Sequence, residues 1–286
     1  MLGCIIGDVV GSYYEVLEVN AIGKNPDKKR SYDERIKVLN EESLFNTFCS
    51  YTDDSVLTVS IADAIINDKS YEDVLREYGL REIDLGLDKY GRSRFGKGFV
   101  SWLKKDSKGD SFGNGSAMRI APVGYLYDDI ESVKYEALKA TIPSHNNVDA
   151  IRSASIVAEV IYLIRCGLKK EELKKYIEDN YCRLDFDLDD LQRNYKFSSK
   201  AINSVPQALF CFLESTDFED SIRKSISIGG DSDTIACIVG GISEAYYGIP
   251  QHLKNEVMNY IPEYFKPVIE EFYKRVNTNK LIRDMI

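Results

Sequence analysis

The segment SIGGDSDTIACIVGGISEAYYGIP, residues 227–250, combines two patterns. Apolar residues recur at helical spacing through its second half, which predicts a helix with a buried face. These residues are Ile235, Ile238, Val239, Ile242 and Tyr246. Gly248 and Pro250 then form a stop signal. The first half places Asp231 and Asp233 at the start of this helix, directly before the buried face, and that position requires an explanation.

Helical periodicity extends over almost the whole chain. We expect helices at roughly 3–14, 54–67, 71–79, 94–104, 116–126, 130–140, 148–166, 170–181, 199–213, 218–227, 232–247, 251–260 and 263–275. The sequence has no series of alternating strands, no internal repeat and no Pro/Gly/Ser-rich linker. We therefore predict an all-α fold in a single domain spanning residues 1–286.

Two charged, turn-rich segments, 23–37 and 183–194, are expected to form surface excursions. Alternating aspartates in the second segment are reminiscent of a calcium-binding loop. However, Asp190 replaces the glycine of the sixth position and Lys196 replaces the bidentate glutamate. The sequence therefore disfavours a calcium loop in this segment.

The composition narrows the class of partner. The chain has 286 residues, a net charge of −9 and a pI of about 5.0, which disfavours nucleic-acid binding and suits an acidic pocket that holds cations. Six cysteines without a CxxC pair favour buried thiols in a reducing compartment, and two histidines are poor material for a zinc site. The N-terminus has no basic region of a signal peptide, and the apolar stretches are too short for a membrane span. We expect a cytoplasmic protein.

The aspartates of the opening segment have two explanations. Acidic residues in the first turn of a helix can cap free N–H groups and oppose the helix dipole. Alternatively, Asp231, Asp233 and the hydroxyl of Thr234 can turn toward one point and hold a hard divalent cation through oxygen atoms. Taken alone, this segment favours capping.

A second helix start changes that preference. Thr52, Asp53 and Asp54 precede another apolar stripe in SYTDDSVLTVSIADAII, residues 50–66. Two such starts brought together supply four carboxylates and two hydroxyls, enough for two divalent cations completed by water and substrate. Without cations the carboxylates would repel one another. The repetition therefore favours a metal site.

Three further segments are candidates for the same site. In GCIIGDVVGSYYE, residues 3–15, glycines four apart predict close helix packing, and Asp8 and Glu15 lie seven apart on one side. The glycine-rich loop around Asn114 could hold a phosphate through backbone N–H groups, although it is not a Walker loop and an ordinary turn is the more frequent meaning. His145 precedes a long helix, where a lone histidine is more often structural than catalytic.

In this order, the segments GCIIGDVVGSYYE, YTDDSVLT, FGNGSAMRIAPVG, SHNN and GGDSDTIACIVGGISEAYYG resemble the ADP-ribosylglycohydrolase family, over residues 3 to about 250. The resemblance implies a single compact orthogonal multi-helix bundle with two Mg²⁺ (or Mn²⁺) ions. It implies an activity that cleaves the glycosidic bond between ADP-ribose and a protein side chain or small acceptor. The metal ligands it implies are Thr52, Asp53, Asp54, Asp231, Asp233 and Thr234. The substrate-binding residues it implies are Asp53, Ser111, Phe112, Gly113, Asn114, Gly115 and His145.

The resemblance also suggests a mechanism. Divalent cations would fix the distal ribose, and nearby carboxylates would stabilise oxocarbenium character at the anomeric carbon. Glu15 or Asp53 would move the proton, and the sequence leaves open which of them does so. The short spacer before Glu15 is similar to that of relatives that act on serine linkages, whereas Arg92 and Arg94 are unexplained.

Two other classes of function remain as alternatives. The first is an ADP-ribose-binding or structural protein of the same fold, as in a lens crystallin of the family, but both aspartate motifs are intact here. The second is a metal-dependent hydrolase of another phosphate compound, which would cut a phosphoric rather than a glycosidic bond. In every case we expect a monomer that binds neither nucleic acid nor membrane.

Overall fold

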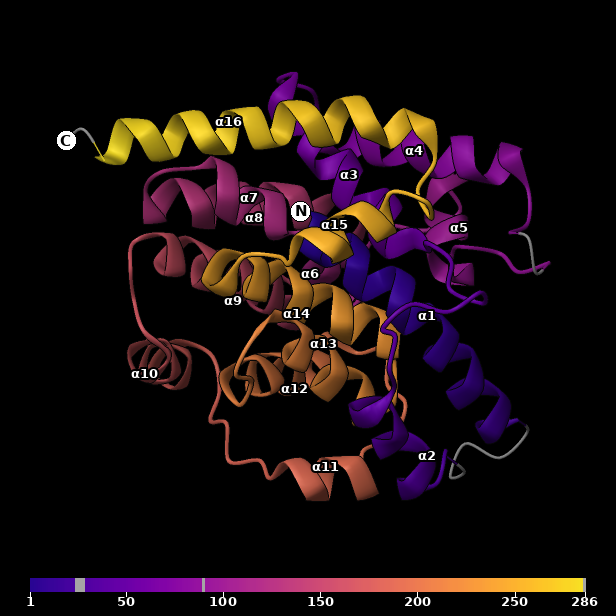
Figure 1. Cartoon of the computed structure of the whole chain (residues 1–286). Coiled ribbons are helices and arrows are strands. Elements are labelled where there is room, and N and C mark those ends of the chain that lie inside the picture. The colour runs from indigo at the N-terminus through magenta and orange to yellow at the C-terminus, as the bar shows by residue number, and fades with distance from the viewer. Residues whose placement is uncertain (24–28, 89–90, 285–286) are drawn as a thin grey trace.

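The computed structural model describes residues 1–23, 29–88 and 91–284, with side chains up to residue 278. Within these residues the chain is helical and has no β-strand, as predicted (Figure 1). The α-helices are α1 Leu2–Ile22, α2 Tyr32–Ile36, α3 Asp53–Ile66, α4 Tyr71–Leu85, α5 Lys97–Leu103, α6 Gly115–Met118, α7 Ala121–Leu126, α8 Ile130–His145, α9 Val148–Arg165, α10 Lys170–Asn180, α11 Leu188–Asn194, α12 Ala201–Leu213, α13 Phe218–Ser227, α14 Ser232–Tyr247, α15 Gln251–Val257 and α16 Lys266–Asp284. Two 3₁₀ helices are η1 Lys37–Asn40 and η2 Glu263–Phe265.

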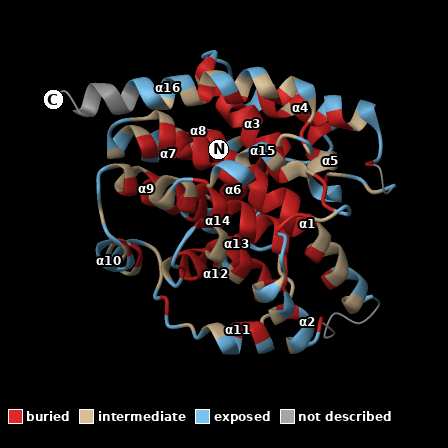
Figure 2. Ribbon diagram, in the orientation of Figure 1, coloured by how far each residue is buried: buried red, intermediate tan, exposed pale blue. Residues whose placement is uncertain are grey.

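Helix α14, which the opening segment predicts, lies in the middle of the protein (Figures 1 and 2). Every residue from Ser232 to Ser243 is buried, so this helix is covered on all sides rather than on one face. It ends at Gly248, whose positive φ of 74° is readily adopted by glycine. The buried centre of the fold therefore begins at the aspartate turn.

Helix α1 packs against α14 with almost no space between their backbones. A Cβ atom on Gly3 would lie 2.2 Å from the carbonyl oxygen of Gly240, and one on Gly7 would lie 2.0 Å from that of Ala236. A Cβ on Gly11 would lie 2.5 Å from the Cα of Asp233. The predicted glycine face is thus confirmed as the contact that places α1 directly beside the second aspartate turn.

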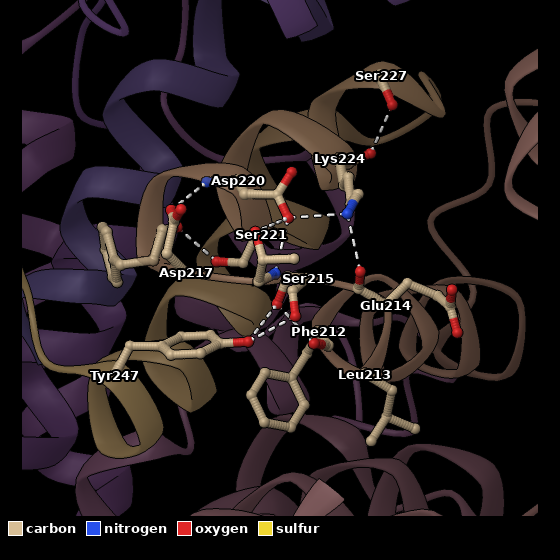
Figure 3. A network of polar contacts seen from close by, with 12 residues as sticks. Phe212, Leu213, Glu214, Ser215, Asp217, Asp220, Ser221, Lys224, Ser227 and Tyr247 are labelled. Atoms are coloured by element: carbon tan, nitrogen blue, oxygen red, sulfur yellow. Dashed lines mark hydrogen bonds and ion pairs between the residues drawn. The ribbon is translucent and has the colours of Figure 1, made fainter.

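The far end of α14 is fixed by polar contacts with the α12–α13 junction, as Figure 3 shows. The Tyr247 hydroxyl donates to the carbonyl oxygen of Ser215 at 2.7 Å. Lys224 Nζ donates to the carbonyl oxygen of Glu214 and to a carboxylate oxygen of Asp220, each at 2.8 Å. These bonds satisfy carbonyl groups at the end of α12 and hold α13 against α14.

The predicted helix positions are confirmed with shifted ends, and two differences have local causes. The predicted helix 116–126 is divided into α6 and α7, because Pro122 lacks an N–H group and is suited to the first turn of a new helix. Helix α11 was not predicted. Asp187 caps it by accepting a hydrogen bond from the N–H of Asp190 at 2.9 Å, which accounts for part of the aspartate pattern there.

The predicted surface excursion at 23–37 is confirmed for Ser31, Asp33, Glu34 and Lys37, which are exposed, whereas residues 24–28 lie outside the described residues. Arg30 and Arg35 are buried, and both form ion pairs with the buried Glu18 of α1. Arg35 also lies against the aspartate loop, because a Cβ on Gly229 would be 2.5 Å from its Cζ. The charges of this segment therefore support the fold behind the second aspartate turn.

The prediction of buried cysteine thiols is confirmed for four of the six cysteines. All six cysteines are free; Cys4, Cys49, Cys211 and Cys237 are buried, whereas Cys166 is exposed. No helix in the described part of the chain combines the length and the apolar composition needed to cross a membrane.

Candidate active site

A cleft of about 610 Å³ brings together the segments that the sequence singled out. Its lining includes Glu15 of α1, both aspartate turns and the glycine-rich loop. Of the predicted site residues, those that line it are Glu15, Thr52, Asp53, Asp54, Ser111, Gly113, Asn114, Gly115, His145, Asp231, Asp233 and Thr234. Phe112 is not among the lining residues; its ring is 54% exposed and lies 5.6 Å from Lys200 Nζ.

The first aspartate turn is held in place by Asp8, which was not predicted as a site residue. One oxygen of its carboxylate accepts hydrogen bonds from the N–H groups of Thr52 at 2.9 Å and Ser55 at 3.0 Å. The other accepts from the Thr52 hydroxyl at 2.6 Å, and the Ser55 hydroxyl donates as well. Thr52 is the N-cap of α3, its hydroxyl also lies 3.1 Å from Asp54 Oδ2, and Asp8 fixes this first turn from outside the helix.

The second aspartate turn does not use Asp231 as a helix cap. Asp231 occupies the N-cap position of α14 but makes no side-chain capping bond. Its carboxylate instead accepts a hydrogen bond from the side-chain amide of Asn114 at 2.7 Å. That amide also donates to the Ser204 hydroxyl at 3.1 Å, which fixes its orientation. The capping explanation is therefore wrong for Asp231, and Asn114 aims its carboxylate into the cleft.

Two groups of carboxylates have the spacing of metal ligands. In the first, one oxygen from each of Asp8, Asp54 and Asp233 lies within 4.8 Å of the others. In the second, the same holds for Glu15, Asp231 and Asp233. Asp233 belongs to both groups, so the two positions are adjacent. The described residues therefore offer oxygen donors of the kind that Mg²⁺ and Mn²⁺ prefer.

The Asp54 carboxylate provides a test of whether a cation fits. Its Oδ1 atom is buried and has no hydrogen-bond partner among the described residues. A buried carboxylate oxygen without a partner is costly, and the surrounding carboxylates worsen the cost. A divalent cation would satisfy this oxygen and neutralise its neighbours, so these residues fit the proposed metal site.

Crowding raises the pKa of several acids in the metal-free protein. The carboxylate of Asp233, together with burial, raises the pKa of Glu15 to about 9. Burial, and then the charges of Asp8 and Glu15, raise the pKa of Asp53 to about 8. Burial and the charge of Glu15 raise the pKa of Asp231 to about 7. The cleft therefore retains protons at neutral pH unless cations replace them.

These shifts predict how stability depends on pH. The pKa values of these acids are higher in the folded than in the unfolded protein, so folding favours their protonated forms and the stabilisation is lost as pH rises through the folded pKa values. Without metal, we expect the free energy of unfolding to fall between pH 6.5 and 9. Added Mg²⁺ should stabilise more at pH 9 than at pH 6.5, because fewer protons compete with it. Denaturant unfolding with EDTA or Mg²⁺ measures both trends, and a metal-free protein that gains stability with pH would contradict them.

The glycine-rich loop is held in place by hydrogen bonds of its own backbone. The N–H of Gly113 donates to the Ser111 hydroxyl at 3.1 Å, and the N–H of Asn114 donates to the carbonyl oxygen of Ser199 at 2.9 Å. Two backbone groups that were expected to hold a phosphate are thus engaged within the protein. Isolated β-bridges pair the backbone of Asp110 with that of His145, at the end of α8, and the backbone of Gly113 with that of Lys200. These contacts explain the loop's fixed position beside the aspartate turns.

Another part of the cleft lining, here called the cationic wall, carries two arginines that are paired with acids. Arg92 and Arg94, unexplained by the sequence, both line it. The guanidinium of Arg92 lies 2.7 Å from a carboxylate oxygen of Asp88, and Arg94 pairs with Glu82 at 3.2 Å. Arg92 is close enough to Glu15 to oppose the rise in its pKa. This wall therefore offers positive charge beside the Glu15 end of the site.

Several known proteins are similar to this chain in sequence. A family model described as ADP-ribosylglycohydrolase matches residues 1–281. ADP-ribosylhydrolase ARH3 of Homo sapiens is 25% identical, over 88% of this chain and 85% of its own. A protein named ADP-ribosylarginine hydrolase Tri1, from Pseudomonas putida, is 23% identical over 48% of this chain and 39% of its own.

A solved structure with a similar fold supports the same grouping. It is titled ADP-ribosylglycohydrolase-related protein complex and superposes with a TM-score of 0.66 at 19% identity. The match covers 96% of this chain and 95% of the other. At this identity the likeness establishes the fold alone, which agrees with the predicted all-α bundle.

Proposed function

The chain belongs to the ADP-ribosylglycohydrolase family and is an enzyme of that kind, and from this membership we propose that it uses divalent cations to cleave the glycosidic bond between ADP-ribose and an acceptor. The acceptor would be a protein side chain or a small molecule, and free ADP-ribose would be the product.

One observation carries the metal dependence. Carboxylates from α1, α3 and the start of α14 form two groups with the spacing of metal ligands, and an oxygen of Asp54 has no partner among the described residues. Capping does not account for this arrangement at Asp231. A cluster of this kind is stable when cations offset its charge.

The proposed ligands are the acids and hydroxyls of the two turns. Thr52, Asp53 and Asp54 would contribute from α3, and Asp231, Asp233 and Thr234 from α14. Divalent cations, when bound, would supply the positive charge that holds the distal ribose hydroxyls and makes nearby water more acidic. Mg²⁺ and Mn²⁺ both suit these oxygen donors.

Proton transfer is assigned to the acids that border the ligands. Glu15 lies beside Asp233 and faces the cationic wall, so it can receive a proton from water or deliver one to the leaving group. Asp53 can do the same from the α3 side. Ionised carboxylates at this position would also stabilise positive charge that develops on the anomeric carbon.

The cationic wall bears on the choice of acceptor. An arginine acceptor carries a guanidinium, which the charge of Arg92, offset in part by Asp88, would repel beside Glu15. A serine hydroxyl is neutral and meets no such repulsion. We therefore propose that a linkage to a neutral hydroxyl is preferred. This agrees with the short spacer before Glu15, which is similar to that of relatives that act on serine linkages.

Reversing one charge should move this preference. We expect Arg92→Glu to raise the ratio of arginine-linked to serine-linked turnover about tenfold, about 1.4 kcal/mol in the relative barrier. Competition between two ADP-ribosylated peptides measures this ratio. Arg183→Glu is the matched control, because Arg183 is exposed and forms a similar pair with Asp185 away from the cleft lining. An unchanged ratio of arginine-linked to serine-linked turnover in Arg92→Glu would show that the charge of Arg92 does not determine the choice of acceptor.

The products of a single reaction test the proposed function. Purified protein is incubated with Mg²⁺ and an ADP-ribosyl-serine peptide or, separately, an ADP-ribosyl-arginine peptide, with EDTA in parallel samples. We expect ADP-ribose and an unmodified peptide, both absent with EDTA. AMP and a peptide that retains phosphoribose would instead indicate cleavage of a phosphoric bond. Tight ADP-ribose binding without release from either serine or arginine peptides would favour the binding-protein alternative.

A further inference from the structure

Arg119 is one of the residues that line the cleft, and it is buried although a guanidinium is always charged in water. Its side chain has no solvent exposure, and Nη2 donates to the carbonyl oxygen of Ala140 at 3.1 Å and to the Ser144 hydroxyl at 2.7 Å. Nε and Nη1 have no hydrogen-bond partner among the described residues. A buried guanidinium with two unbonded groups is costly, so its position requires a reason beyond packing.

The Ser144 hydroxyl connects Arg119 to the cleft. Its Oγ atom lies 2.7 Å from Arg119 Nη2 and 2.8 Å from Nδ1 of His145. A guanidinium can only donate, so Oγ is the acceptor in the first bond. The hydroxyl hydrogen then has one acceptor among the described contacts, which is Nδ1 of His145. If Nδ1 donated instead, this buried hydrogen would have no partner.

The direction of these bonds determines where the imidazole carries its hydrogen. In a neutral imidazole, one nitrogen accepts and the other donates. Because Nδ1 accepts from Ser144, the hydrogen is on Nε2. Nε2 faces the glycine-rich loop, since a Cβ on Gly115 would lie 3.1 Å from it and one on Gly113 would lie 3.7 Å from it. His145 also lines the cleft.

We propose that Arg119 and Ser144 are positioning residues that hold His145 as the neutral Nε2–H form, which donates to an anionic oxygen of the ligand at the glycine-rich loop. The N–H groups of Gly113 and Asn114 are already bonded within the protein, so they leave this oxygen to other donors. That the anion is the diphosphate of ADP-ribose rests on the proposed function.

The charges around His145 favour its neutral form. Burial lowers the pKa of His145 well below its ordinary value, and the positive charge of Arg119 lowers it further. Burial lowers the pKa of Arg119 to about 9, and the carboxylate of Asp53 opposes this change, so the guanidinium stays charged at neutral pH. The fixed cation therefore prevents the imidazole from becoming a second cation and leaves it as a directional donor.

Nitrogen NMR of histidine-labelled protein tests this proposal directly. The chain has only two histidines, and His252 is exposed and serves as an internal reference. We expect His145 to show a hydrogen-bearing Nε2 and an unprotonated Nδ1 from pH 8 down to pH 5. A hydrogen on Nδ1, or a doubly protonated ring near pH 6, would overturn the proposal.

Substitution of the serine separates positioning from folding. In Ser144→Ala we expect the Nδ1 signal to shift toward a mixture of the two neutral forms and the affinity for ADP-ribose to fall about tenfold. Ser225→Ala removes an equally buried hydroxyl of α13 and should change neither. If Ser144→Ala left both the His145 signal and the affinity for ADP-ribose unaltered, the proposed positioning role of Ser144 and Arg119 would be overturned. Wild-type protein that fails to bind ADP-ribose would count against the proposed function. The position of the hydrogen on the His145 ring would still decide whether Ser144 and Arg119 position the imidazole.

Discussion

Asp231→Asn is expected to abolish turnover and, at the same time, to stabilise the metal-free protein. The substitution removes a proposed ligand, so we expect turnover to fall at least a thousandfold, about 4 kcal/mol of transition-state stabilisation. It also removes a charge from a buried cluster in which the pKa of Asp231 is raised to about 7. At pH 8 the wild-type carboxylate is mostly ionised, and its burial among other carboxylates opposes folding.

The size of the stabilisation follows from the pKa shift. An acid whose pKa rises from about 4 to about 7 on folding costs on the order of 2–4 kcal/mol at pH 8, so the melting temperature with EDTA should rise by about 5 °C or more. Thermal unfolding with EDTA and with Mg²⁺ measures this effect. The wild type should gain stability from Mg²⁺, whereas the variant should gain little.

Asp129→Asn is the matched control for this experiment. Asp129 caps α8 at the surface by accepting a hydrogen bond from the N–H of Ser132 at 2.8 Å, and an asparagine can replace it as a cap. We expect this variant to keep both its turnover and its response to Mg²⁺. An Asp231→Asn variant that is less stable than the wild type in EDTA would show that the carboxylate supports the fold rather than a cation.

Gly7→Ala is expected to destabilise the protein more than ordinary core substitutions do. The new Cβ would lie 2.0 Å from the carbonyl oxygen of Ala236 on α14, and backbone cannot move aside as a flexible side chain can. Helices α1 and α14 would have to separate, at a cost of about 3 kcal/mol or more. That separation would also move Asp8 and Glu15 away from Asp233, so both metal affinity and turnover should fall.

Two further glycines test this explanation. Gly98→Ala places the same side chain in a helix with no atom within 4 Å, and should leave the free energy of unfolding unchanged or slightly higher. Gly11→Ala places its Cβ 2.5 Å from the Cα of Asp233 and should therefore weaken Mg²⁺ binding. Denaturant unfolding and metal titration measure these effects. A Gly7→Ala protein as stable as Gly98→Ala would contradict the account of close packing.

Much of the site could be predicted from the sequence because its residues lie in short local patterns. Aspartates at two helix starts, such as Asp54 and Asp233, are visible without knowledge of the fold, since helix starts are marked by local sequence. The glycine face of α1 is visible because its spacing of four matches a helix face. The predicted single domain, monomeric state and cytoplasmic location stay predictions.

The contacts that arrange these motifs could not be predicted, because their partners are distant in the chain. Asp8 bonds to residues 44 and 47 positions away, and Asn114 bonds to Asp231 across 117 positions. Arg35 was assigned to a charged surface segment, yet it is buried against the aspartate loop. Composition identifies such residues as charged, whereas only the packing of helices shows which of them are paired inside.

The positions of Mn²⁺ ions in a crystal grown with ADP-ribose test the central claim most directly. Anomalous scattering locates Mn²⁺ without assumptions about its ligands. We expect two peaks between the carboxylates of the α3 and α14 starts, with the distal ribose of ADP-ribose against them. Mn²⁺ elsewhere, or ADP-ribose bound away from Asp54, Asp231 and Asp233, would contradict the claim that these turns form the catalytic metal site.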